Sequence, residues 1–305
     1  MKQLKDKDLI HLLDLSQEIS QTSPKDANAL TFLARPFVQT TLPHRDPGAL
    51  PEWVRRNGNL TLSIRPGWRD NPETGQREPI GIPFGTIPRL LLFWLTTEAK
   101  RTGDKKIFLG ENISNFMRKI GLDPRQGGKR SDTARLKNQM SRLFESVISF
   151  HQVNTSEAMV QNNWLNMNIT SFGNLWELSE FSKYRKDNVL PEGYIVLGEE
   201  FFQALTHSAV PLDLRIINEF KQSPLALDLY AFLSYRGFTL STKSSPLILS
   251  WEQLHQQCGA DYKDVKDFAK KAKDVIKKIQ ALSRNVEIEN LRGRLKISSK
   301  LTIIK

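Results

Sequence analysis

The sequence predicts an α+β protein built from two tandem winged helix-turn-helix domains behind an N-terminal helical extension. Three observations predict it. One order of elements occurs twice, corresponding positions are offset by nearly the same distance, and each pass contains a long helix carrying basic residues. The repeated order is helix, short strand, short helix, turn, long helix and hairpin. The predicted domains are residues 1–24, the amphipathic extension; residues 25–220, a winged helix with added β elements and a dimerisation option; and residues 221–305, a DNA-binding winged helix.

Composition excludes several classes of protein. With 39% hydrophobic and 25% charged residues among 305, the chain can bury sizeable cores and is not of disordered composition. Its one cysteine, Cys258, excludes a disulfide framework and a cysteine-rich zinc site, so we expect a packed thiol and a reducing compartment. We find no apolar run of membrane-spanning length and no secretory signal, and therefore expect a soluble intracellular protein.

The charge is strongly skewed. The chain holds 44 Lys and Arg against 33 Asp and Glu, a formal net charge of +11. Such a surplus indicates a polyanionic partner, although it is also compatible with a general role in solubility.

Residues 1–20 have the pattern of an amphipathic helix, with apolar positions at Leu9, Leu12, Leu13, Leu15 and Ile19. Two interpretations stay open: the helix docks on the body of the protein, or it binds a partner.

Strand-like sequence follows from Leu30 to Ile82. Residues 59–64 alternate polar and apolar side chains, which predicts a strand, and residues 71–75 form a turn signal.

The first pass then begins with a helix that Pro88 opens and Gly103 ends. Proline at the first helical position and glycine just past the last are the expected punctuation. Residues 107–109 predict a short strand, and residues 112–120 a short helix ended by Gly121.

A long helix from about Ser131 to Ser149 is expected next, and its inner face consists of Leu136, Met140, Leu143, Phe144 and Val147. A hairpin from Trp164 to Leu178, turning at residues 172–174, completes the pass.

The second pass repeats this order with almost no identical letters. Pro224 opens a helix that ends near Gly237, residues 247–249 predict the short strand, and Ser250 caps a short helix ending at Gly259. A long helix from about Tyr262 to Leu282, capped by Asp261, leads to a final hairpin over residues 286–304.

This last long helix resembles a DNA-reading element. One face is apolar, and a second carries lysines at three- and four-residue steps: Lys263, Lys266, Lys270, Lys273 and Lys277. A recognition helix needs one side for its own domain and another for the major groove. The hairpin adds Arg292, Arg294 and Lys296 at the position of a wing. Residues 261–305 hold 13 Lys and Arg against 6 Asp and Glu, so the charge surplus is concentrated here. Lysines mainly bind phosphate and supply affinity without sequence information.

The first long helix is better suited to reading bases. Arg135, Asn138 and Arg142 line up at three- and four-residue steps, after Arg125, Lys129 and Arg130. Arginine pairs with guanine and asparagine with adenine through two hydrogen bonds. The alternative for this face is a dimer interface.

Catalytic patterns are weak. Residues 127–131 superficially suggest a phosphate loop, but an arginine follows the lysine and the earlier glycine is missing. The five histidines are scattered without metal spacing, and no nucleophile elbow occurs, so we expect no enzyme, no cofactor and no metal site.

Several stretches together resemble the RepA-type plasmid replication initiators. They span residues 30–300 in the family's order, and they are residues 85–99, 116–121, the Gly-Gly-Lys loop with residues 135–144, 211–215 and 223–236. The resemblance implies a protein that binds directly repeated sequences (iterons) at a plasmid origin, helps to open the duplex and recruits host initiator and helicase proteins. It also implies a homodimer option, copy control and repression of the protein's own promoter. A stand-alone winged-helix repressor is the main alternative, and an origin-nicking enzyme is a weaker one.

Overall fold

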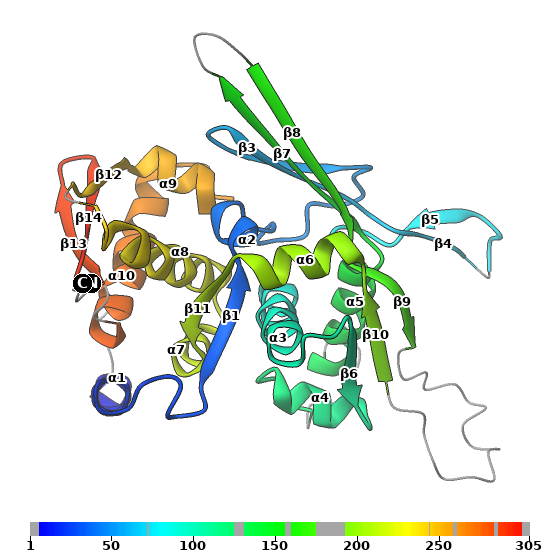
Figure 1. Cartoon of the computed structure of the whole chain (residues 1–305), viewed down its shortest axis with the longest axis horizontal. Coiled ribbons are helices and arrows are strands. Elements are labelled where there is room, and N and C mark those ends of the chain that lie inside the picture. The colour runs from blue at the N-terminus through cyan, green and yellow to red at the C-terminus, as the bar shows by residue number, and fades with distance from the viewer. Residues whose placement is uncertain are drawn as a thin grey trace.

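The computed structural model describes residues 6–71, 73–124, 131–155, 160–174, 193–243, 245–258, 261–283 and 286–300. It is a mixed α+β structure with several small sheets, which confirms the predicted fold class at that level (Figure 1). No helix in the described ranges is long and apolar enough to cross a membrane.

The N-terminal helix α1 (Asp6–Gln21) docks on the body of the protein. The Ser16 hydroxyl donates to the Ala281 carbonyl oxygen at 2.6 Å, and Arg215 donates to the Thr22 carbonyl oxygen at 2.9 Å. The apolar face is less completely used than its pattern predicts: Leu12 is buried, whereas Leu9 and Leu13 are 47% and 61% exposed.

A central two-stranded sheet joins distant parts of the chain. Strand β1 (Leu30–Ala34) pairs antiparallel with β11 (Ala209–Asp213), with Leu30 opposite Asp213 (Figure 1). Helix α2 (Arg35–Gln39) follows β1 and packs on the second half of the chain through α8 (Pro224–Leu240).

A four-stranded antiparallel sheet has the order β2-β3-β7-β8 and projects from the body (Figure 1). Its strands are β2 (Trp53–Asn57), β3 (Leu60–Arg65), β7 (Val147–Thr155) and β8 (Val160–Asn168). Strand β3 confirms the predicted strand, and the hairpin β4 (Trp68–Asp70) with β5 (Arg77–Pro79) confirms the expected turn.

The first helix–sheet unit follows the predicted order of elements within residues 86–197. Its members are α3 (Thr86–Thr102), β6 (Lys106–Gly110), α4 (Ile113–Lys119), α5 (Asp132–Phe144), β9 (Thr170–Asn174) and β10 (Gly193–Leu197). Two of the predicted signals are confirmed: Gly103 ends α3 in the left-handed conformation, and Gly121, with a φ of +78°, follows the end of α4. The predicted start is wrong, because α3 begins at Thr86, two residues before Pro88. The Asn112 side chain caps α4.

Two predictions in this unit are wrong. The long helix ends at Phe144, and Val147 begins β7, because β-branched and aromatic residues over 147–153 pair with β3. Residues 172–174 form no turn but lie in β9, where Gly173 is opposite Ile195. The expected hairpin is thus divided, with β8 paired to β7 and β9 paired to β10.

Helices α6 (Glu199–His207) and α7 (Leu214–Phe220) flank β11 and lead to the second helix–sheet unit, residues 224–299. Its members are α8, β12 (Leu247–Ser250), α9 (Trp251–Cys258), α10 (Val265–Leu282), β13 (Val286–Leu291) and β14 (Arg294–Ser299).

In the second unit the predicted cap of α9 is confirmed, while the end of α8 and the start of α10 differ from the prediction. Ser250 and Gln253 exchange backbone-to-side-chain hydrogen bonds of 3.2 and 2.8 Å, a capping box at the start of α9. Helix α8 runs to Leu240, past the predicted stop at Gly237, because Gly237 and Leu240 lie on its buried face, while Phe238 on the other face is 62% exposed. Asp264, not Asp261, caps α10 by accepting a hydrogen bond from the Lys266 amide at 2.7 Å.

The two units share their strand order as well as their element order. The first sheet runs β6-β10-β9 and the second β12-β14-β13, so in each the earliest strand pairs with the latest. All these pairings are antiparallel. The long β7–β8 hairpin is the main addition in the first unit, inserted between its long helix and β9.

A buried charged cluster, the clasp, joins the two units. Arg89 on α3 contacts both carboxylate oxygens of Asp228 on α8, at 2.7 and 2.8 Å, and His44 contacts the same carboxylate at 2.8 Å. The guanidinium also donates to the carbonyl oxygens of Leu42, Pro43 and Gly85. Burial by itself raises the pKa of Asp228, but the Arg89 charge and the hydrogen bonds from His44 and Arg89 together hold that pKa below its usual value.

Candidate nucleic-acid interface

Helix α10 presents a cationic stripe on the side opposite its packed face. Its buried residues are Phe268, Ala269, Ala272, Val275, Ile276, Ile279 and Leu282. At 100° per residue these fill one half of the helix, and four lysines fall together on the other half: Lys266, Lys270, Lys273 and Lys277. Asp267 and Asp274 lie beside the stripe, not within it.

The four lysines differ in their surroundings. Lys266, Lys270 and Lys277 are exposed and form no ion pair with the described residues. Lys273 is half-buried, with its Nζ 5.2 Å from the centre of the Trp251 ring. Lys263, which the sequence placed on the helix, precedes the cap and lies outside the stripe. Three ammonium groups of the stripe are therefore exposed and have no carboxylate partner in the part of the chain that the structure describes.

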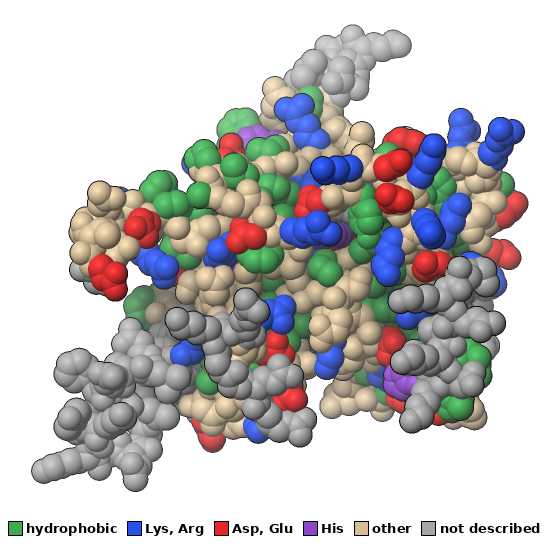
Figure 2. Space-filling model, turned by 180° about the vertical axis from the view of Figure 1, so that it is seen from behind, with side chains coloured by type: hydrophobic (Ala, Val, Ile, Leu, Met, Phe, Trp, Pro, Cys, Tyr) green, Lys and Arg blue, Asp and Glu red, His purple; other side chains and the backbone are tan. Residues whose placement is uncertain are grey.

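The β13–β14 hairpin adds further cations. Its turn consists of exposed Arg292 and Gly293, whose φ of +73° favours glycine, and Arg294 opens β14. Lys296 already has a partner, because its Nζ lies 2.9 Å from the Glu289 carboxylate. Figure 2, seen from behind, shows Lys and Arg side chains spread over the half of the molecule that holds this unit, interspersed with acidic ones.

Helix α5 places two of its three predicted readers at the surface. The Ser131 hydroxyl caps the helix by accepting from the Ala134 amide at 3.2 Å. Arg135 and Asn138 are exposed, and Arg135 lies 2.9 Å from Asp132 in an ion pair on its own helix. They border a shallow depression of about 380 Å³ beside the first turn of α3, and its other lining residues are Phe84, Gly85, Thr86, Ile87, Ala134 and Gln139.

Arg142, the third predicted reader, does not line this depression. Its side chain is 16% exposed, lies over the Phe84 ring and donates to Asp46 at 3.2 Å and to the Ile82 carbonyl oxygen at 3.1 Å. These contacts fix loop 80–86 against α5, so we assign Arg142 to positioning that loop. Arg125, Lys129 and Arg130, the predicted basic entry to the helix, lie outside the described residues.

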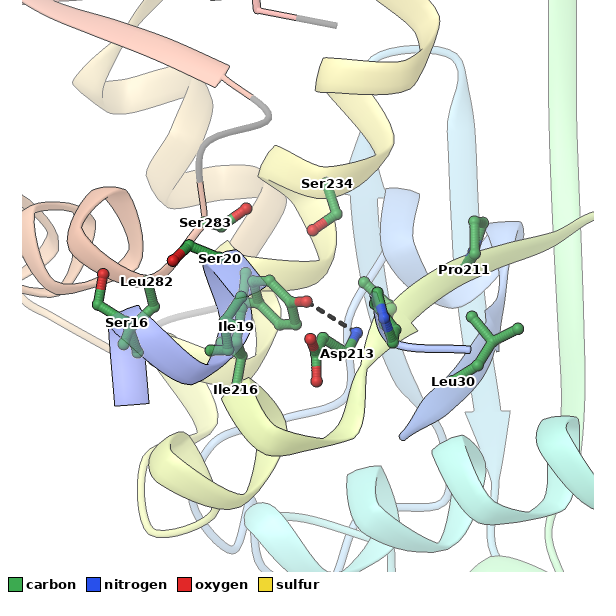
Figure 3. Close-up of a pocket in the computed structure, with 13 residues that line it drawn as sticks. Ser16, Ile19, Ser20, Leu30, Pro211, Asp213, Ile216, Ser234, Leu282 and Ser283 are labelled. Atoms are coloured by element: carbon green, nitrogen blue, oxygen red, sulfur yellow. Dashed lines mark hydrogen bonds between the residues drawn. The ribbon is translucent and has the colours of Figure 1, made fainter. Parts of the chain in front are cut away.

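A second cavity and two buried titratable groups lie outside the cationic surfaces. The cavity between α1, α7, α8 and α10, of about 310 Å³, is lined mainly by serines and apolar residues, and there the Tyr230 hydroxyl accepts from the Asp213 amide at 2.9 Å (Figure 3). Burial raises the pKa of the Tyr230 phenol and of the packed Cys258 thiol. Within the described ranges no three His, Cys, Asp or Glu residues are grouped to hold a metal ion.

Comparison with known protein families gives a match that covers the first helix–sheet unit and the start of the second. Residues 82–253, more than half of the chain, match the family described as plasmid encoded RepA protein. The chain belongs to the RepA family. The RepA match begins just before α3 and extends to the start of α9, so it includes α5 and both residues of the Arg89–Asp228 contact. The lysine stripe of α10 lies beyond it. Membership supports a role in initiating plasmid replication. No curated protein matches the chain closely enough to count as a relative.

The contacts of the clasp were not predicted from the sequence. Arg89 and Asp228 both lie in stretches that resemble the RepA family, but nothing in their spacing indicates that they meet. The one available signal is a charged residue inside an otherwise apolar helix, as in the run Leu227-Asp228-Leu229. A buried charge of this kind requires a partner.

Proposed function

We propose that this RepA protein initiates plasmid replication, without catalysis of its own, by binding directly repeated duplex sequences at the origin. In this proposal the two helix–sheet units act as tandem winged helices, with α5 and α10 entering successive major grooves. Opening of the duplex and recruitment of host initiator and helicase proteins follow from binding. Repression of the protein's own promoter uses the same two units.

One observation carries the proposal. Both units place a long helix between the first strand and the last two strands of a three-stranded sheet with the same strand order, and each long helix bears cations on the face turned from its core. Family membership supports the same conclusion independently, because it is carried by residues 82–253 and not by the lysine stripe. The domain limits 1–24, 25–220 and 221–305 belong to this proposal too.

The proposal is tested by competition binding on the plasmid's own origin. Specific affinity is expected to exceed that for random duplex by about three or more powers of ten. Equal affinity for the two duplexes would contradict sequence-specific binding. An origin-dependent replication assay, run beside a promoter-repression assay, separates an initiator from a stand-alone repressor.

The two long helices are expected to respond differently to substitution. Arg135→Ala or Asn138→Ala should relax preference at particular base pairs, at a cost of about 1–3 kcal/mol each, because their hydrogen bonds would read base edges. The measurement is binding to a set of duplexes that each carry one changed base pair. The matched control is Lys137→Ala on the same helix. A uniform loss of affinity across all duplexes would show that these residues only contact phosphate.

A further inference from the structure

The outer face of the β6-β10-β9 sheet is aromatic. Along β6 and β10 the burial alternates strictly: Ile107, Leu109, Ile195 and Leu197 face the core. The intervening positions turn outward, and they hold Phe108, Tyr194 and Val196. Phe172 on β9 completes a row of rings across all three strands. We call Phe108, Tyr194 and Phe172 the aromatic platform.

The three rings lie side by side and accessible. Their centroids are 6.3 Å apart for Phe108 and Tyr194, and 6.0 Å apart for Phe172 and Tyr194. Phe108 is 50% exposed and Phe172 58% exposed, large fractions for rings on a regular sheet.

The Lys106 ammonium group lies over two rings of the aromatic platform. The Lys106 Nζ lies 4.3 Å from the Tyr194 ring centre and 5.1 Å from that of Phe108. Lys119 at the end of α4 lies beside Gly110, at the neighbouring end of β6. Lys105, by contrast, is neutralised by Glu199 at 2.7 Å. The platform thus combines ring faces with ammonium groups that a phosphate backbone can approach.

The second unit shows that the fold does not require these rings. In its sheet, Ile248 is opposite Lys296 as Phe108 is opposite Tyr194, and Lys296 pairs with Glu289 on the third strand. Where one sheet carries an ion pair, the other carries exposed aromatics. The difference is therefore specific to the first unit.

We propose that the aromatic platform binds unpaired single-stranded DNA, with bases stacked on Phe108, Tyr194 and Phe172 and phosphates near Lys106. Stacking on aromatic side chains together with a cationic groove is the general way in which proteins hold unpaired strands. This inference rests on the proposed origin function, which makes an opened duplex the source of such a strand. It adds a second nucleic-acid surface, separate from α5 and α10.

The test uses the full chain and a fluorescently labelled oligothymidylate of about 16 nucleotides. Phe108→Leu and Phe172→Leu keep apolar area but remove the ring face, and each is expected to weaken binding by about 5- to 100-fold. Tyr194→Phe, which keeps the ring, should bind as the parent does. Ile248→Ala, at the matching position of the second sheet, is the control and should change nothing.

Duplex origin DNA is measured with the same variants, and unchanged duplex affinity supports a separate site. Failure of the parent protein to bind the oligonucleotide, or parental binding by the leucine variants, overturns the proposal. Equal loss on duplex and single strand also overturns it. If the leucine variants instead change only the oligomeric state by light scattering, the face is an interface between copies. Loss of specific duplex binding by the parent protein would count against the origin function, not against the platform.

Discussion

Asp228→Ala is expected to lower the free energy of unfolding by about 3–5 kcal/mol. The substitution leaves the Arg89 guanidinium, whose side chain is 5% exposed, without its carboxylate in the interior. His44, whose side chain is 10% exposed, loses the same partner. Arg89 would retain only its three carbonyl acceptors, which cannot neutralise it. Urea denaturation followed by far-UV circular dichroism measures the loss.

Two further variants sharpen this prediction. Glu289→Ala breaks the exposed ion pair with Lys296 and should leave the free energy of unfolding unchanged, because exposed pairs contribute little. The double change Arg89→Met with Asp228→Leu should recover most of the loss, since it leaves no unpaired charge. A cost for Asp228→Ala no greater than that for Glu289→Ala would contradict the role given to the clasp.

The clasp also predicts a dependence of stability on pH. Because the pKa of Asp228 in the folded protein lies below its ordinary value, the carboxylate contributes stability above about pH 4. That contribution is lost as the pH falls through the lowered folded value. The difference in unfolding free energy between the parent and Asp228→Asn should therefore be constant above about pH 5 and narrow below about pH 4. A difference in unfolding free energy that grows as the pH falls would contradict a lowered pKa for Asp228 in the folded protein.

The second large effect concerns the lysine stripe. Changing Lys266, Lys270 and Lys277 together to glutamine should weaken duplex binding without altering base preference, because ammonium groups contact phosphate. The slope of the logarithm of affinity against the logarithm of salt concentration should fall by about 0.9 for each phosphate that the variant no longer neutralises. Titrations at several salt concentrations, with origin and random duplex, measure both quantities.

The matched control removes the same charge elsewhere. Lys25, Lys100 and Lys105 are exposed and lie outside α10, so changing all three to glutamine lowers the net charge equally. Only the stripe variant should show a smaller slope of the logarithm of affinity against the logarithm of salt concentration. If both triple variants behaved alike, the effect would come from overall charge and the stripe would have no special part in binding.

Local signals allowed much of the fold to be predicted. Glycine and serine signals correctly placed one end of α3, α4 and α9, since Gly103, Gly121 and Ser250 act through contacts within a few residues. The end of α5 was misplaced because residues 145–149 are compatible with a helical face, and only pairing with β3 makes residues 147–149 part of a strand. The β1–β11 pair was unpredictable for the same reason, as its strands lie far apart along the chain.

The candidate interface, like the fold, was predictable where local spacing decides it and unpredictable where long-range contacts do. Periodicity correctly placed Lys266, Lys270 and Lys277 on one outward face of α10. It could not show that Arg142 turns inward, because the contact with Asp46 joins distant segments. Nor could it show that Lys273 packs over Trp251 or that Lys296 pairs across a hairpin. Helical spacing determines which face a residue occupies, while tertiary contacts determine whether its charge is free.

If each of the two similar units places one helix in a major groove, a single origin repeat is contacted at two separate segments. Hydroxyl-radical footprinting and methylation interference on a single origin repeat test it most directly. The account predicts two protected segments on one face of the duplex, with centres about one helical turn apart. Changes at Arg135 and Asn138 should affect one segment, and changes at Lys266, Lys270 and Lys277 the other. One protected segment that responds equally to both sets of variants would contradict it.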